Sequence, residues 1–171
     1  MSDSGKHAPV IVIFGVSGCG KTTIANVVSE RLSIPYYDAD DFHPASNIEK
    51  MRNGIALTDT DRLPWLQAMA HQITLWENSG GAVLACSALK EKYRKLLASK
   101  ATQPIQWVLL SGTFELIKSR IKARKDHFMS TTLLQSQFDT LEIPDYGLNI
   151  SIEKTPKAIA NTIITKLNKY E

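Results

Sequence analysis

Apolar residues along the chain fall into short runs of strand length that alternate with segments of helical spacing. Unbroken apolar runs at residues 10–14 and 82–86 have the length of strands that are covered on both faces, and the largely apolar residues 105–110 indicate a further strand. Residues 148–152 alternate apolar and polar positions, which indicates a strand with one polar face. A short strand is also expected at residues 35–38. The pattern therefore predicts about five strands.

Apolar residues that recur every three or four positions between these runs predict helices. The expected helices cover residues 21–32, 61–77, 89–99, 114–125, 132–141 and 156–167. Pro64 and Pro156 fall in first turns, where proline is tolerated. Strands joined through helices form right-handed crossovers and parallel neighbours. We therefore expect an α/β fold in three layers, with a sheet of about five mostly parallel strands.

Composition excludes several other classes of protein. The 171 residues are 43% hydrophobic and 22% charged, which suits one globular domain and not a disordered chain. The net charge of +3 is too small to indicate a nucleic-acid partner, and no apolar run approaches the roughly 18 residues of a membrane span. Two distant cysteines form neither a metal pair nor a disulfide framework. We expect a flexible leader at residues 1–9 and a single cytoplasmic domain at residues 10–171, with neither nucleic acid nor membrane as a partner.

The strongest chemical signal is Gly15-Val16-Ser17-Gly18-Cys19-Gly20-Lys21-Thr22, which matches the P-loop motif G-x-x-x-x-G-K-[ST] between a buried strand and a helix. Its glycines let backbone N–H groups surround a phosphate, and the helix N-terminus adds partial positive charge. Lys21 is expected to reach the β- and γ-phosphates and Thr22 to bind Mg²⁺. Residues from Gly15 to Thr23 are therefore the expected ATP-binding segment. Cys19 is expected to be a small loop residue rather than a reactive thiol.

A P-loop by itself leaves a small-molecule kinase, a switch GTPase and a mechanical ATPase open. The guanine-reading N-K-x-D motif is absent, and no Asp ends the strand at residues 82–86 to bind Mg²⁺. The chain instead has Asp38 and Asp40 at the end of a short strand and a basic segment at residues 118–125. Lys, Arg and Asp around a phosphate loop can neutralise the transferred group and orient an acceptor hydroxyl. This set favours kinase chemistry.

Several further strings together resemble the gluconokinase family. They are YDADDFHP (37–44), NIEKM (47–51), DTDRLPWL (59–66), ACSALKEKYR (85–94) and RIKARKDHFM (120–129). The resemblance spans residues 10–142 and implies an adenylate-kinase-like P-loop kinase fold, related to shikimate kinases. It places an acceptor-binding region at about residues 40–78 and a lid at about residues 118–140. It also implies phosphorylation of D-gluconate at its 6-hydroxyl by ATP with Mg²⁺, and it suggests a homodimer.

Two alternative functions remain open at this point. The chain could be a P-loop kinase for another acceptor, such as shikimate, a nucleoside monophosphate or another sugar acid. It could also be a regulatory module that binds ATP without turnover, because the usual Mg²⁺-binding Asp is missing.

The resemblance assigns roles to the acidic residues and to one arginine. Asp40 is expected to contact the acceptor hydroxyl and take its proton, while Asp38 holds a water on Mg²⁺. Capping of a turn or helix is the alternative for these acids, and Asp41 is the expected cap. Arg62 is expected to bind the substrate carboxylate, because a planar fork of donors recognises a carboxylate better than a point charge. An ion pair with Asp59 or Glu49 is its alternative.

Other basic side chains are candidates for contacts with substrate or nucleotide. His43, Lys90 and Arg94 are expected to touch the polyol or its carboxylate, with a structural role as the alternative. Arg120 and Arg124 lie one helical turn apart and are able to face the same way. Arg124 is then expected to contact the triphosphate during catalysis, and Arg120 the adenine or the phosphates. A solvated basic helix face is the alternative for this segment.

Replacement of the P-loop lysine tests the phosphate-binding segment. Lys21→Ala should reduce turnover by about 100-fold or more, because it removes a donor aimed at the charge that develops on the phosphates. The protein should still fold, as judged by circular dichroism, and Lys157→Ala in the last helix should leave ADP release unchanged. Near-normal turnover by Lys21→Ala would contradict the assigned role.

Overall fold

The computed structural model describes residues 8–124 and 130–168. Within them, five strands form one sheet in the order β2-β3-β1-β4-β5, and every neighbouring pair is parallel. The strands are β1 (Val10–Phe14), β2 (Tyr36–Asp38), β3 (Ala82–Cys86), β4 (Gln106–Ser111) and β5 (Leu148–Ser151). The expected α/β class and parallel sheet are confirmed.

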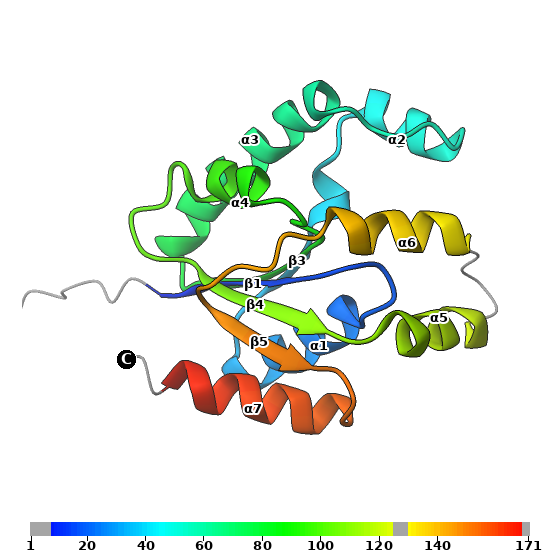
Figure 1. Cartoon of the computed structure of the whole chain (residues 1–171). Helices are drawn as coiled ribbons and strands as arrows, with labels where there is room; N and C mark the ends of the chain where they lie inside the picture. The colour runs from blue at the N-terminus through cyan, green and yellow to red at the C-terminus, as the bar shows by residue number, and fades with distance from the viewer. Residues whose placement is uncertain (1–7, 125–129, 169–171) are drawn as a thin grey trace, which may run out of the picture.

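Helices cover both faces of this sheet, which gives the three expected layers (Figure 1). On one face lie α1 (Lys21–Leu32) and α7 (Pro156–Asn168), and on the other lie α3 (Asp59–Glu77) and α4 (Glu91–Ala98). The remaining helices are η1 (Ala39–Phe42), α2 (Ala45–Arg52), α5 (Phe114–Ala123) and α6 (Thr131–Thr140). No helix in the described part of the chain is long and apolar enough to cross a membrane.

Strand β1 separates two hydrophobic cores, which explains its unbroken apolar sequence. Ile11 and Ile13 belong to the core under α1 and α7, whereas Val10, Val12 and Phe14 belong to the core under α3 and α4. All five side chains are buried. Because complete burial of one such side chain contributes about 1.5–3 kcal/mol, a polar residue anywhere in β1 would be costly. The strand therefore forms a rigid base for the loop that follows it.

Helix α3 begins at Asp59, two residues earlier than expected, because local hydrogen bonds extend its first turn. The Asp61 N–H donates to the Thr58 hydroxyl over 3.1 Å, and the Asp61 carboxylate accepts from the Thr58 N–H over 2.9 Å. This reciprocal capping box satisfies backbone groups that a helix terminus otherwise leaves without partners.

Helix α2 was not expected, because its residues show no apolar stripe. Its buried side chain is the polar Asn47, which donates to the backbone oxygen of Asp61 over 2.9 Å. A tertiary hydrogen bond therefore anchors this helix to α3. Hydrophobic periodicity cannot predict such a contact, because it reports only the spacing of apolar residues.

A buried carboxylate at the end of α3 holds the segment that leads into β4. Glu77 is buried and accepts hydrogen bonds from the N–H groups of Thr102 and Gln103, each over 3.1 Å, and from the Thr102 hydroxyl over 2.9 Å. The carboxylate thereby satisfies donors of a loop that has no secondary-structure partners of its own.

Glu77→Gln should destabilise the protein by about 1–3 kcal/mol, because the amide of Gln turns one acceptor into a donor that faces other donors. For a chain of this size, Tm should fall by roughly 2–4 °C per kcal/mol. The same change at exposed Glu153 should leave Tm unchanged. Thermal melts that show equal Tm values for the two variants would contradict this role for Glu77.

Candidate active site

The carboxyl ends of β1, β2 and β3 meet at one edge of the sheet and carry the candidate site. The P-loop follows β1, Asp38 ends β2 and Ser87 follows β3. The Gly15 N–H donates to the Ser87 carbonyl oxygen over 3.3 Å and so ties two of these loops together. In open parallel α/β sheets, ligands bind outside this edge.

The P-loop closes around the amine of Lys21 and packs directly against α5. Lys21 Nζ donates to the carbonyl oxygens of Gly15 and Val16, each over 3.0 Å. Gly18 has a φ of +82°, and a Cβ there would lie 2.6 Å from Cγ1 of Ile121, so the loop leaves no room for a side chain. A cavity of about 90 Å³ beside the loop is lined by Gly18, Gly20, Lys21, Thr22, Thr23 and Arg124.

The two cysteines near the site are buried and unreactive. Burial raises the pKa of the Cys19 thiol, although Lys21 opposes this effect. Burial also raises the pKa of Cys86 to about 12. A thiolate is therefore disfavoured at both positions. These observations agree with Cys19 as a small loop residue rather than a reactive thiol.

Arg120 and Arg124 contact different parts of the protein, although their spacing would allow them to face the same way. Helix α5 ends at Ala123, and Arg124 has an extended backbone with φ −86° and ψ 116°. Arg120 donates to the carbonyl oxygen of Ile152, just after β5, over 2.7 Å. Arg124 instead lines the P-loop cavity. Helical spacing fails as a guide because the helix ends between the two residues.

Asp38 is the residue that caps η1, and the expectation that Asp41 is the cap is therefore wrong. One carboxylate oxygen of Asp38 accepts from the Asp40 N–H over 2.9 Å, and the other accepts from the Tyr36 hydroxyl over 3.3 Å. Asp38 lies one residue before the first turn, where a carboxylate best satisfies free N–H groups.

The carboxylate of Asp40 projects toward solvent at the same edge, and its side chain is 81% exposed. Protein atoms around this edge nevertheless weaken the hydration of the carboxylate. This desolvation, followed by the negative charge of Asp38, raises the pKa of Asp40 above its ordinary value. Lys21 opposes the rise, which also indicates that Asp40 and the P-loop lysine are close enough to interact.

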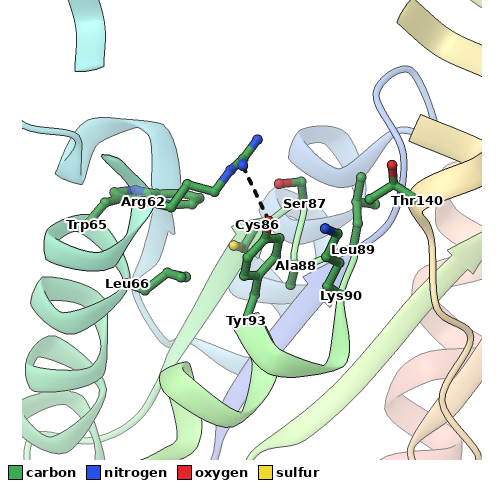
Figure 2. A pocket seen from close by; sticks show the side chains of 10 residues that line it. All are labelled: Arg62, Trp65, Leu66, Cys86, Ser87, Ala88, Leu89, Lys90, Tyr93 and Thr140. Atoms are coloured by element: carbon green, nitrogen blue, oxygen red, sulfur yellow. Dashed lines mark hydrogen bonds between the residues drawn. The ribbon is translucent and has the colours of Figure 1, made fainter. Parts of the chain in front are cut away.

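A second cavity, of about 170 Å³, lies beside Ser87, and we call it the Arg62 cavity. Its lining residues are Arg62, Trp65, Leu66, Cys86, Ser87, Ala88, Leu89, Lys90, Tyr93 and Thr140. Figure 2 shows that Arg62 reaches over Tyr93 toward Ser87. The structure therefore brings Arg62 and Lys90 to one small cavity, as the sequence predicted for two residues that contact substrate.

Tyr93 holds the guanidinium of Arg62 at this cavity. Arg62 donates to the Tyr93 hydroxyl over 3.3 Å (Figure 2), and this hydroxyl in turn donates to Asp59 over 2.7 Å. Arg62 also lies 3.7 Å from the Asp59 carboxylate, which is the ion pair considered as its alternative. The side chain keeps about a third of its surface exposed, so it can meet both partners and a ligand.

His43 lies between the acidic edge and α3. Its ring stacks on Trp65 with 4.1 Å between ring centres, and Nε2 lies 3.9 Å from a carboxylate oxygen of Asp40. Burial, followed by the positive charge of Arg62, lowers the pKa of His43. Its surroundings therefore favour the neutral imidazole over the imidazolium.

Arg94 does not line the Arg62 cavity. Its side chain is 1% exposed, and it donates to the carbonyl oxygens of Ala88 and Glu142, each over 2.6 Å. Further hydrogen bonds go to Tyr146 and Glu91. The structure thus favours the structural alternative for Arg94, because a guanidinium whose donors point at protein acceptors has little to offer a ligand.

The oxygen ligands that Mg²⁺ prefers are present at the expected positions. The hydroxyl of Tyr36 contacts the Asp38 carboxylate and lies beside Thr22, so these two residues flank one phenol. Among the described residues, no group of three or more His, Cys, Asp or Glu side chains could hold a metal ion. A Mg²⁺ ion would therefore need oxygens from a bound nucleotide as well.

Three contact residues were not predicted from the sequence. Tyr93 and Thr140 line the Arg62 cavity. The side chain of Gln137 is uncharged and accepts a hydrogen bond from the P-loop. Tyr93 lies in a basic string whose spacing carries no sign of its contact with Arg62. Thr140 and Gln137 lie on α6, and Gln137 is 120 positions from Ser17 in the sequence.

Known proteins of similar sequence and structure include several kinases. The family model for shikimate kinase matches residues 17–166. A gluconokinase of Arabidopsis thaliana is 42% identical, with 91% of this chain and 90% of the relative covered. The thermoresistant gluconokinase of Escherichia coli (strain K12) is 41% identical, with 84% and 82% covered. A gluconokinase crystal structure from Sinorhizobium meliloti 1021 has a TM-score of 0.87 and 34% identity, with 96% and 94% covered.

The effects of Asp38 and Asp41 on the pKa of Asp40 can be tested separately. Asp40 should titrate above the ordinary value of about 4, and Asp38→Asn should lower its pKa by removing the nearer negative charge. Asp41→Asn should lower it less, because Asp41 makes the weaker contribution. Carbon-13 NMR of the Asp40 carboxyl group measures both shifts. An equal or reversed order would contradict this electrostatic picture.

Proposed function

The chain belongs to the gluconokinase family, within the wider group that includes shikimate kinases, and we propose that it phosphorylates D-gluconate at its 6-hydroxyl with ATP. The products are 6-phospho-D-gluconate and ADP. The observation that supports this proposal most is the position of the Arg62 cavity next to the P-loop. A triphosphate and a carboxylate could then bind to separate cationic groups at one edge of the sheet, the first at the P-loop cavity and the second at the Arg62 cavity.

The nucleotide side of the proposed site is built on the P-loop. The segment from Gly15 to Thr23 wraps around the phosphates and presents N–H groups to them, and Lys21 exchanges its contacts with loop carbonyls for the β- and γ-phosphates. Arg124 contacts the triphosphate from the far side of the cavity that it lines. Arg120, held near β5, has the adenine or the phosphates as its proposed partner. Mg²⁺, held by Thr22 and through a water by Asp38, would supply neutralisation of phosphate charge.

The acceptor side of the proposed site is built on α3 and the loop after β3. Arg62 binds the gluconate carboxylate through its planar fork, and Tyr93 holds the fork in place. Lys90 adds a second cation at the same cavity. His43, stacked on Trp65, hydrogen bonds to the polyol as a neutral group. A cavity of about 170 Å³ suits a small acceptor, well below the size of a drug-binding pocket.

Asp40 is the proposed partner of the reacting hydroxyl. Desolvation, followed by the negative charge of Asp38, raises the pKa of Asp40, which makes its carboxylate a stronger base. A loose transition state demands little proton transfer, so orientation of the 6-hydroxyl toward the γ-phosphorus is the main task of Asp40. The proton leaves the hydroxyl for the Asp40 carboxylate as the new P–O bond forms and the bond to ADP breaks.

The proposal also assigns roles to two regions of the chain, and it includes a cellular location and an oligomeric state. Residues 40–78 form the acceptor-binding region, and residues 118–140 form a lid that excludes water during transfer. Residues 125–129 of this lid lie outside the described part of the chain. A cytoplasmic location and a homodimer are further proposals, which rest on the family resemblance.

A panel of acceptors tests the function directly. ADP release from Mg-ATP should increase strongly with D-gluconate and little with shikimate, a nucleoside monophosphate or D-glucitol, which lacks the carboxylate. Arg62→Lys should raise KM for D-gluconate by about tenfold or more and leave KM for ATP unchanged, because Lys cannot form a two-point contact. Arg31→Lys, at the end of α1, is the matched control. Failure of D-gluconate to stimulate ADP release would overturn the proposed function.

A further inference from the structure

The side chain of Gln137, on α6, contacts the P-loop from another part of the chain. Its Oε1 accepts a hydrogen bond from the backbone N–H of Ser17 over 2.7 Å. This distance is at the short end of the range for N–H···O hydrogen bonds. Ser17 is the third residue of the loop motif, so Gln137 holds one of the N–H groups that form the phosphate cradle.

Packing of α6 fixes the position of Gln137. Leu134 is buried in the core under α1 and α7, and the ring of Phe138 packs edge-on against Phe114 of α5, with 5.6 Å between ring centres. Directly after the helix, the Glu142 N–H donates to the Leu89 carbonyl oxygen over 2.8 Å. The carboxamide of Gln137 is therefore presented from a supported helix, not from a free loop.

The face of α6 that carries Gln137 also reaches the acceptor side of the site. Thr140, three residues further along α6 and therefore on the same face, lines the Arg62 cavity (Figure 2). Ser87 lines that cavity too, and its carbonyl oxygen accepts from the Gly15 N–H of the P-loop. One face of α6 thus borders both the phosphate loop and the acceptor cavity.

We propose that Gln137 is a positioning residue for phosphoryl transfer, which holds the acceptor-facing side of the P-loop through Ser17 without adding charge. The proposal rests on the proposed function. Its central physical point is neutrality, because an amide oxygen satisfies the Ser17 N–H as an uncharged acceptor. A carboxylate would make a stronger hydrogen bond to the same N–H but would place a negative charge beside the transferred group.

This difference makes Gln137→Glu the decisive variant. If Gln137 only supports the fold, Glu keeps the acceptor oxygen, and the variant should bind ATP and turn over like the wild type. If Gln137 positions the loop beside the phosphates, the variant should keep or raise its Tm but bind Mg-ATP about tenfold more weakly at low salt. Added salt should reduce this loss, because it screens charge repulsion. Isothermal titration calorimetry measures ATP affinity without any acceptor.

Gln137→Ala tests positioning apart from charge. It leaves the Ser17 N–H without its protein acceptor, so kcat should fall by about tenfold while KM for D-gluconate changes by less than about twofold. The matched control for Gln137→Glu is Gln135→Glu, which adds the same negative charge two residues away on the same helix. Gln135 is exposed and bonds only to Asp139 of its own helix among the described residues.

The outcomes separate this proposal from the proposed function. Weaker, salt-sensitive ATP binding by Gln137→Glu, with normal binding by Gln135→Glu, supports the proposal. Wild-type affinity and turnover in Gln137→Glu, or an equal loss in Gln135→Glu, overturns it. If the wild-type protein binds ATP but does not phosphorylate D-gluconate, the proposed function fails, and the ATP affinities of the variants still decide whether Gln137 borders the phosphates.

Discussion

Burial of β1 on both faces is the constraint on which the candidate site depends. A loop that presents backbone N–H groups to an anion must keep its shape, so the loop and its ends must be held in place; Val16 and Cys19 anchor it in the core under α1 and α7. The strand before it lies between two hydrophobic cores, and α5 packs against Gly18. Loss of packing at β1 would therefore loosen the phosphate cradle before it affected any catalytic side chain.

The same edge of the sheet separates two regions for anions. Lys21 and Arg124 border the P-loop cavity, whereas Arg62 and Lys90 border the cavity beside Ser87. Asp38 ends β2 and Asp40 follows it in η1, where desolvation and then the negative charge of Asp38 raise the pKa of Asp40. The net charge of only +3 therefore gives no sign that positive and negative side chains gather at this edge of the sheet.

Much of the fold was predictable, because strands buried on both faces and amphipathic helices leave strong local patterns. All five strands and the helices between them were expected, but α2 was missed because a single buried amide anchors it. Among the site residues, the P-loop and Arg62 lie where their motifs indicated. For Arg94 the structure favours the structural alternative, because its guanidinium donates to buried backbone carbonyls.

The amino-acid sequence by itself determined the order of strands and helices, the P-loop and the kinase family, because each depends on residues that are close together in the chain. Tertiary structure alone decided that Arg120 and Arg124 point to different partners, that Tyr93 holds Arg62, and that Gln137 meets Ser17. The last contact joins residues 120 positions apart. Local sequence carries no signal for such a pair, because only the packing of helices onto the sheet brings the two residues together.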